Sequence, residues 1–331
     1  MSNALRSLAG NALPAVGLGC MPLSHAYSNQ PDDDDGEKLL HHAIDLGYKH
    51  FDSARLYGHG HNEALLARVL KTRRDEMFIT SKCGIEFTGG KRGIDCSPQA
   101  IVKAVEASLQ TLEVDFIDLY YLHRRDFTVP IEDSVGTLAA LKEEGKIGGI
   151  GISEMSADTL RQAHAAHPID AIQNEYSLWT RNAELGVLNA CRELGVAFVA
   201  FSPVARGVLA SGVKDPLTLE EGDLRRSHPR FNAENWAINA TLAEQFDALA
   251  IEANVTSAQL ALSWVLAQGD FIHVIPGTTS AKHLKENFAT LDLQVTKTAL
   301  DKADALINQS AVAGHRYPEG MRKTIDTEEI T

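Results

Sequence analysis

The sequence lacks paired cysteines, long hydrophobic runs and an excess of positive charge. Its four cysteines, at positions 20, 83, 96 and 191, are widely spaced and form no CxxC or metal-ligand motif, so we expect no bound metal. This usage is typical of reduced thiols in a cytoplasmic protein rather than of a disulfide framework. The longest apolar runs are only strand-length, and residues 1–10 hold no apolar segment of the kind that directs secretion. We therefore expect a cytoplasmic protein without a membrane partner.

Basic residues are outnumbered, with 31 Lys and Arg against 44 Asp and Glu and a formal net charge of −13. Nucleic-acid binding needs a basic footprint, so this balance argues against a nucleic-acid partner. Hydrophobic residues make up 44% and charged residues 23% of the chain, which excludes a disordered or fibrous protein. A length of 331 residues fits two average domains, but α/β barrels of similar length form one domain.

Short apolar segments alternate with helical patterns along almost the whole chain. Eight segments are predicted to be strands, at residues 16–20, 48–52, 77–82, 117–122, 147–153, 171–174, 197–202 and 272–275. Helices are predicted at residues 36–46, 62–71, 98–112, 131–144, 156–166, 183–194, 236–253, 257–267 and 281–288, with one more near 298–308. Strands separated by helices of this length imply parallel pairing.

The alternation predicts an α/β fold, a single (β/α)8 TIM barrel with an extra C-terminal helix and long loops at the C-terminal face. A doubly wound sheet has the same periodicity. The count of eight favours the barrel, as does the lack of a GxGxxG motif after the first strand, where only Gly17-Leu18-Gly19 is present. We expect one domain over residues 1–331, with the barrel core at about 14–290 and the helix and tail at 291–331.

Two segments fall outside the alternation. Residues 5–13 are predicted to form a small hairpin that caps the bottom of the barrel. The long connection at 206–235 follows the seventh strand, so it would lie at the C-terminal face, where barrel active sites are found. Structureless connections of this length are usually functional, and we interpret this one as a lid, with an inert excursion as the alternative.

Side chains with acid–base chemistry follow three consecutive predicted strands. Asp52 ends the second strand and is followed by Tyr57, Lys82 ends the third, and His123 follows the fourth. Each has an ordinary alternative: a helix-capping Asp, a Lys that extends to solvent, a His that is structural. Together, the ammonium would lower the pKa of the phenol, the carboxylate would hold the ammonium, and the imidazole would orient a carbonyl oxygen. The four suit the protonation of a carbonyl as negative charge develops on its oxygen.

The segments around these residues resemble the signature segments of the aldo-keto reductases. They read DSARLYG at 52–58, TSK at 80–82 and YYLHRRD at 120–126. Further matches occur in family order at Asn62-Glu63, 149–153, 173–177, 201–203 with Gly207, 275–278, and Glu286-Asn287. The resemblance covers residues 16–287 and points to the bacterial and plant branch that includes pyridoxal reductases and is related to potassium-channel β subunits.

The resemblance implies an NAD(P)H-dependent reductase of aldehydes and ketones. Tyr57 would be the general acid, Lys82 would lower its pKa, Asp52 would hold Lys82, and His123 would orient the substrate carbonyl. The hydride would come from the nicotinamide ring. NADP(H) is the cofactor that we expect, with NAD(H) as the alternative.

The resemblance also implies cofactor-binding positions. Ser153 and Gln173 match residues that hydrogen-bond the nicotinamide carboxamide, and Phe201 stands where many relatives have a stacking Tyr. Glu154 replaces a frequent Asn, and a carboxylate can accept a hydrogen bond from the carboxamide but cannot donate one. The pyrophosphate and adenine ends would be held by Ser202, Pro203, Val204, Arg206, Gly207, Ile275, Gly277, Thr278, Thr279, Ser280, Lys282, Glu286 and Asn287.

The resemblance to the family is weakest at the residues that would bind the 2′-phosphate of NADPH. Ser280 and the backbone at a helix start can bind phosphate, and Lys282 adds one charge. Thr279 and His283 stand where a second basic residue is expected, which leaves NADH use open. Candidates for the wall of the substrate pocket are Met21, Tyr27, Phe87 and Trp179, because apolar and aromatic lining suits aldehydes and ketones.

Two other functions compete with the reductase. A redox-sensing regulatory subunit with slow turnover would bind the same nucleotide and use the same cleft. A hydrolase or isomerase without a cofactor would need paired carboxylates or a metal cluster at the strand ends, and the sequence shows neither.

Overall fold

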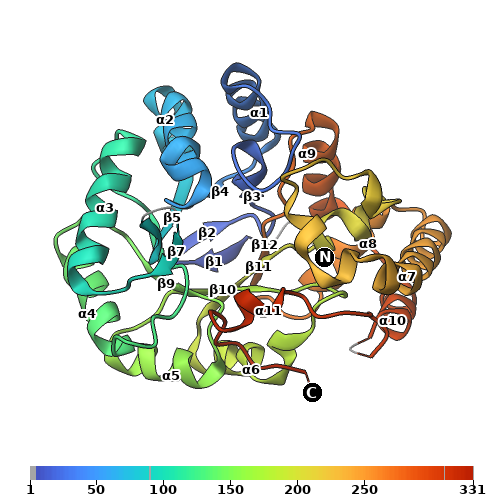
Figure 1. Ribbon diagram of the computed structural model, residues 1–331. Coiled ribbons are helices and arrows are strands. Elements are labelled where there is room, and N and C mark those ends of the chain that lie inside the picture. Colours follow the sequence, from blue (N-terminus) through green and yellow to red (C-terminus); the bar gives the residue numbers. More distant parts are fainter. Residues whose placement is uncertain (1–4, 89–90, 309, 331) are drawn as a thin grey trace.

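The structure, a computed structural model, describes residues 5–88, 91–308 and 310–330. Eight parallel strands follow one another in chain order, with helices around them (Figure 1). The strands are β3 (Leu18–Gly19), β4 (His50–Asp52), β5 (Phe78–Cys83), β8 (Leu119–Leu122), β9 (Ile150–Ser153), β10 (Ala171–Glu175), β11 (Ala197–Phe201) and β12 (Ile272–Val274). The sheet closes on itself because Val16 forms a parallel bridge with Val274 and the Gly17 amide donates to the Val274 carbonyl at 2.8 Å. The predicted (β/α)8 barrel is confirmed.

The helices that follow the strands form the outer ring of Figure 1. They are α1 (Asp33–Leu46), α2 (His61–Arg73), α3 (Pro98–Leu112), α4 (Ile131–Glu143), α5 (Ala157–Ala166), α6 (Val187–Leu194), α7 (Ala233–Glu252), α8 (Ser257–Leu266), α9 (Ala281–Phe288) and α10 (Lys297–Leu306). The short α11 (Glu319–Arg322) lies inside this ring in the same view. Asp32 caps α1 by accepting from the Asp35 amide, and three more Asp residues lie in its first turn, where the helix dipole favours negative charge. Covered by this ring, the strands are buried almost throughout.

The predicted N-terminal hairpin is present. Strands β1 (Arg6–Leu8) and β2 (Asn11–Leu13) pair antiparallel. Leu8 and Leu13 are buried inside the barrel against residues that begin the strands: Phe78, Leu119, Ala171 and Ala197. The hairpin therefore closes the N-terminal end of the barrel, opposite the end at which the acid–base residues lie.

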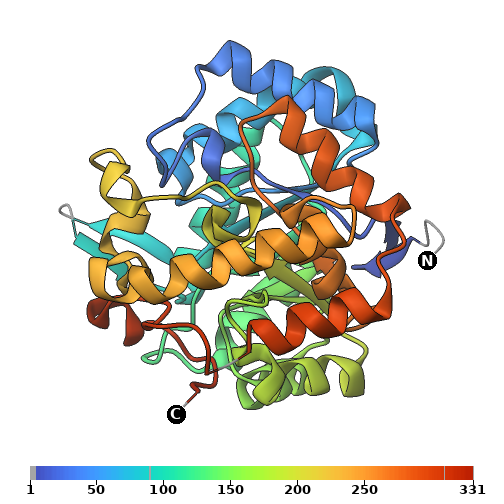
Figure 2. The ribbon, with the colours of Figure 1, turned by 90° about the vertical axis from the view of Figure 1, so that its right-hand side faces the viewer.

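A second hairpin, β6 (Ile85–Thr88) and β7 (Lys91–Ile94), was not predicted. It leaves the end of β5 at Gly84, whose φ of +98° is accessible mainly to glycine. Each of its strands has only four residues, too few for a clear strand pattern in the sequence. In Figure 2 this teal hairpin, the yellow connection at 206–235 and the red α11 lie at the same end of the barrel.

The long connection at 206–235 is not structureless. It contains four short 3-10 turns at Ala205–Ala210, Pro216–Thr218, Leu224–Ser227 and Pro229–Phe231, and α7 starts at Ala233 instead of at 236. Within the described residues, no single helix is long and apolar enough to cross a membrane, although the bent pair α7 and α8 passes by length and composition together.

We expect Leu8→Ala to lower the free energy of unfolding by about 2–5 kcal/mol, because it leaves a cavity in the plug of the barrel. Urea denaturation followed by fluorescence measures the change. Leu5→Ala is the matched control, since Leu5 is 59% exposed and its loss should cost under about 0.5 kcal/mol. Equal midpoints for the two variants would contradict the role of the hairpin as a plug.

Candidate active site

A cleft of about 1010 Å³ opens at the C-terminal end of the barrel strands. It is lined by most of the residues that the sequence singles out: Met21, Tyr27, Asp52, Tyr57, His123, Ser153, Gln173, Phe201, Ser202, Pro203, Val204, Arg206, Gly207, Ile275, Gly277, Thr278, Thr279, Ser280, Glu286 and Asn287. Residues of the 206–235 connection also line it, among them Leu219 and Arg225. The connection thus lies over the cleft, as a lid requires.

A buried ion pair lies at the base of this cleft. The Lys82 ammonium is fully buried and donates to Asp52 Oδ1 and, at 2.7 Å, to the Ser53 carbonyl. Asp52 Oδ2 accepts from Thr80 Oγ1 at 2.8 Å and from Gln173 Nε2 at 2.7 Å. Burial lowers the pKa of Lys82, and the charge of Asp52 opposes that shift. Asp52 therefore holds Lys82, as predicted, and ties β4, β5 and β10 together at their ends.

Tyr57 is held by a turn with left-handed backbone. Gly58 and Gly60 have positive φ, and a Cβ on Gly60 would lie 2.6 Å from the Arg55 guanidinium. Arg55 pairs at 2.9 Å with the buried Glu63, which also accepts from Ser81 at 2.6 Å. This network fixes the start of the turn against β5, so the Tyr57 ring is directed into the cleft.

The phenol of Tyr57 is protonated in this environment. Its ring centroid lies 5.9 Å from that of His123 and 5.3 Å from the Lys82 ammonium. Burial raises the pKa of Tyr57 well above its usual value, the charge of Asp52 raises it further, and Arg124 opposes the shift. The net shift of this pKa is therefore upward, because desolvation dominates, and the role of Lys82 in lowering it during the reaction stays a prediction. A buried neutral phenol can serve as a proton donor.

His123 is uncharged. Burial lowers the pKa of its imidazole well below the usual value, and the charges of Arg124, Lys82 and Arg92 add to that shift. A neutral imidazole can donate one hydrogen bond to a carbonyl oxygen without competing with Tyr57 for the proton.

The walls of the cleft suit a dinucleotide. After β11, Ser202, Ala205, Arg206 and Gly207 all have φ between 50° and 95°, and Ser202, Arg206 and Gly207 line the cleft. Opposite, Ser280 caps the eight-residue helix α9 and accepts from the His283 amide at 3.5 Å. A helix N-terminus of this kind favours phosphate. These two segments line the cleft where the resemblance places the pyrophosphate and the 2′-phosphate.

A model of the Aldo/keto reductase family matches residues 15–308 of the chain. The chain belongs to this family.

The chain aligns with individual relatives over nearly its full length. The chain is 40% identical to aldo-keto reductase yakc of Schizosaccharomyces pombe, whose name specifies NADP(+), over 98% of this chain and 97% of the relative. It is 41% identical to probable aldo-keto reductase 1 of Glycine max, over 94% and 90%. The solved structure of the glycerol dehydrogenase AKR11B4 from Gluconobacter oxydans superposes with a TM-score of 0.83 at 25% identity, covering 100% of this chain and 98% of that one.

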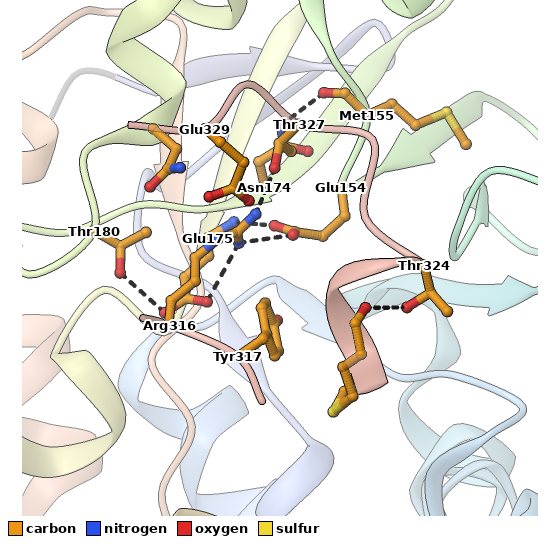
Figure 3. Close-up of polar contacts among 12 residues, drawn as sticks. Glu154, Met155, Asn174, Glu175, Thr180, Arg316, Tyr317, Thr324, Thr327 and Glu329 are labelled. Atoms are coloured by element: carbon orange, nitrogen blue, oxygen red, sulfur yellow. Dashed lines mark hydrogen bonds and ion pairs between the residues drawn. The ribbon is translucent and has the colours of Figure 1, made fainter. Parts of the chain in front are cut away.

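One expected cofactor residue of this aldo/keto reductase lies elsewhere. Glu154 is buried outside the cleft lining, and Figure 3 shows Arg316 between it and Glu175. Glu154 Oε1 accepts from the Glu175 amide at 2.8 Å and Oε2 accepts from Arg316 at 2.7 Å, so neither oxygen is available to a nicotinamide. The structure therefore places Glu154 in the attachment of the C-terminal tail rather than at the cofactor.

Other assignments also change. Lys282 is exposed and does not line the cleft, and Trp179 is 4% exposed and packs in the core. The side chain of Phe87 lies outside the described residues. Arg206 lines the cleft but also pairs with Glu175 at 3.1 Å, which reduces the charge it offers to a phosphate.

The prediction missed several residues that line the cleft: His25, Arg92, Arg124, Tyr317 and Met321. His25 and Arg124 lie close in sequence to predicted site residues, so their neighbours indicated that this part of the chain belongs to the site. Tyr317 and Met321 belong to the C-terminal tail. Arg316 attaches this tail to the barrel by binding Glu154, which lies about 160 residues earlier in the sequence. No local pattern indicates such a contact.

Arg316→Leu is expected to lower the free energy of unfolding by about 3–5 kcal/mol, because it removes one partner of a buried ion pair and leaves Glu154 without a cation. Urea denaturation measures the loss. Lys323→Leu, an exposed change in the same tail, should cost under about 0.5 kcal/mol. Similar midpoints for Arg316→Leu and the parent chain would contradict the attachment.

The same variant should become more sensitive to acid. Burial alone would raise the pKa of Glu175, but Arg206, Arg316 and Arg230 together lower it to about 2. A depressed carboxyl pKa contributes stability above the unfolded value of about 4.3, and this is lost as the pH falls toward 2. Without Arg316 the folded pKa rises, so that contribution should disappear at a higher pH during an acid titration followed by circular dichroism.

Proposed function

We propose that the chain is an NADPH-dependent reductase of aldehydes and ketones in which Tyr57 is the general acid. The observation that carries the proposal is the cluster at the base of the cleft: a protonated phenol, a neutral imidazole and a buried Lys82–Asp52 pair on adjacent strand ends. Membership of the aldo/keto reductase family and the NADP(+) in the name of a 40% identical relative support it. Both favour the reductase over a redox-sensing subunit.

The described residues fit a nicotinamide dinucleotide. Ser153, Gln173 and Phe201 would hold the nicotinamide, the 202–207 backbone the pyrophosphate, and Ser280 at the start of α9 the adenosine phosphate. Bound NADPH supplies the hydride that is added to the carbonyl carbon. Gln173 donates to Asp52 through Nε2, so its amide oxygen is the atom that would accept from a carboxamide.

Tyr57 donates its proton to the substrate oxygen as negative charge develops there. The Lys82 ammonium, 5.3 Å from the centre of the ring, stabilises the phenolate that this transfer leaves. His123 orients the same oxygen by a hydrogen bond. The Asp52 carboxylate keeps the ammonium in position through the three contacts that it makes.

We also propose that residues 1–331 form one domain and that the protein is cytoplasmic. The tail supports the first point, because Arg316 joins it to carboxylates at the ends of β9 and β10. The four cysteines support the second, since all are buried as free thiols.

Tyr57→Phe should lower kcat for an activated aromatic aldehyde by about 100- to 10,000-fold while leaving the Kd for NADPH within about twofold, because only the proton donor is lost. The rate of NADPH oxidation and a fluorescence titration measure the two. Tyr120→Phe is the control, a hydroxyl outside the cleft lining that bonds to Ser108 at 2.9 Å. An unchanged rate for Tyr57→Phe would refute the acid, and tight NADPH binding without turnover in the parent chain would favour the sensing subunit.

Thr279→Arg should tighten NADPH by about tenfold and leave NADH unchanged, because a guanidinium would then meet the 2′-phosphate. Thr279 lines the cleft just before α9, and its hydroxyl oxygen accepts from Asn29 Nδ2 at 3.4 Å. Titrations with both cofactors measure the effect. Thr279→Val controls for the lost hydroxyl, and an equal gain for NADH would show that the 2′-phosphate lies elsewhere.

A further inference from the structure

Two arginines of the cleft have no acidic partner among the residues that the structure describes. Four arginines line it: Arg92, Arg124, Arg206 and Arg225. Arg206 pairs with Glu175 at 3.1 Å, and Arg225 pairs with Asp223 at 2.6 Å. Over the described part of the chain, the other two form no ion pair with a carboxylate.

Arg124 is the more constrained of the two. Its side chain is buried, with 6% exposure, and Nη1 donates to the His123 carbonyl at 2.7 Å. Nε has no hydrogen-bond partner among the residues described. A buried guanidinium that keeps both an unmade hydrogen bond and an unbalanced charge is costly, so the site favours an anion that supplies both.

Arg92 brings a second positive charge to the same place. It projects from β7 of the second hairpin and is exposed. Neighbouring protein atoms desolvate part of its guanidinium and lower its pKa, and the charge of Arg124 lowers it further, which means that the two guanidinium groups repel one another. Both arginines line the same cleft as Tyr57 and His123, and Arg124 directly follows His123 in the chain, so the pair lies at the catalytic end of the cleft.

None of the described carboxylates that line the cleft forms an ion pair with Arg92 or Arg124. These carboxylates are Asp52, which pairs with Lys82, Glu220 on the long connection and Glu286 on α9. The positions expected to hold the cofactor phosphates follow β11 and begin α9, whereas Arg92 and Arg124 come from β7 and from the end of β8. The pair is therefore free to bind substrate.

We propose that the substrates of this reductase carry an anionic group, a carboxylate or a phosphate, that Arg124 and Arg92 bind while the carbonyl meets Tyr57 and His123. The proposal rests on the proposed function. A planar guanidinium binds either group through two parallel hydrogen bonds, which gives orientation as well as affinity. The class is thus oxo acids and phosphorylated aldehydes or ketones, in preference to neutral carbonyl compounds of the same size.

The test compares kcat/KM for 4-formylbenzoate and its methyl ester with NADPH. We expect the acid to be preferred by about 10- to 100-fold, the range for a hydrogen bond to a charged group. Arg124→Gln should bring the ratio close to one, and Arg92→Gln should lower it by about threefold, because an exposed charge contributes less. Arg226→Gln is the control, an exposed arginine outside the cleft lining, and should leave the ratio unchanged.

A third aldehyde, 4-formylphenyl phosphate, distinguishes the two kinds of anion. A higher kcat/KM than that of 4-formylbenzoate assigns the site to phosphate, and a lower one assigns it to carboxylate. An acid-to-ester ratio near one in the parent chain, with both aldehydes reduced, would overturn the anion site and leave the reductase function intact.

Equilibrium binding tests the anion site without turnover. In the presence of NADP+, calorimetry should show 4-methylbenzoate binding at least about tenfold more tightly than 4-methylbenzamide, with the difference lost in Arg124→Gln. Equal affinities in the parent chain would overturn the proposal. If Arg124→Gln does not fold, the same measurement is made on Arg92→Gln, which should fold because Arg92 is exposed on a hairpin. If neither aldehyde is reduced, the proposed function fails and this binding experiment alone decides the anion site.

Discussion

The ion pair between Lys82 and Asp52 is the interaction on which the site depends. An ammonium with no solvent exposure is stable only if its charge is balanced and its donors find acceptors. Asp52 balances the charge of Lys82, and Asp52 and the Ser53 carbonyl accept two hydrogen bonds from it. Because Asp52 also accepts from Thr80 and Gln173, three strands end in one fixed arrangement. The same neutralisation leaves the phenol of Tyr57 in surroundings dominated by burial, so it keeps its proton until negative charge appears on a bound oxygen.

A second buried cluster attaches the end of the chain to the barrel. Arg316 meets Glu154 at 2.7 Å and Glu175 at 3.5 Å, and Glu175 also meets Arg206 from the loop after β11. Glu175 therefore links the tail with a loop that lines the cleft. Tyr317 lies between the Arg316 and Arg206 guanidinium groups, 5.0 and 5.3 Å from its ring centre, and also lines the cleft. The tail is a part of the cleft wall and not an appendage of the barrel.

The sequence predicted the features that depend on neighbouring residues in the chain. The bounds of α3, the acidic start of α1 and the positions of Asp52, Tyr57, Lys82 and His123 at strand ends all follow from periodicity and chain order, since parallel strands bring their ends to one rim. The partners of Glu154 and the Tyr57 pKa could not be predicted, because each depends on burial and on residues far away in the sequence. The resemblance points to Glu154 because it stands where relatives often have Asn, yet its left-handed backbone, with φ of 54°, and Arg316 direct it away from the cleft.

The unpaired arginines stand in contrast to the net charge of −13. At physiological salt, charges more than about 8 Å apart through solvent are largely screened, so the acidic surface has little influence inside the cleft. Arg124 is buried, where screening is weak and an unmade hydrogen bond is costly. The field that a bound substrate meets is therefore set by a few groups near Tyr57 and not by the protein as a whole. Selection for an anion would arise from contacts made after entry, because a surface with a net negative charge offers anions no long-range attraction.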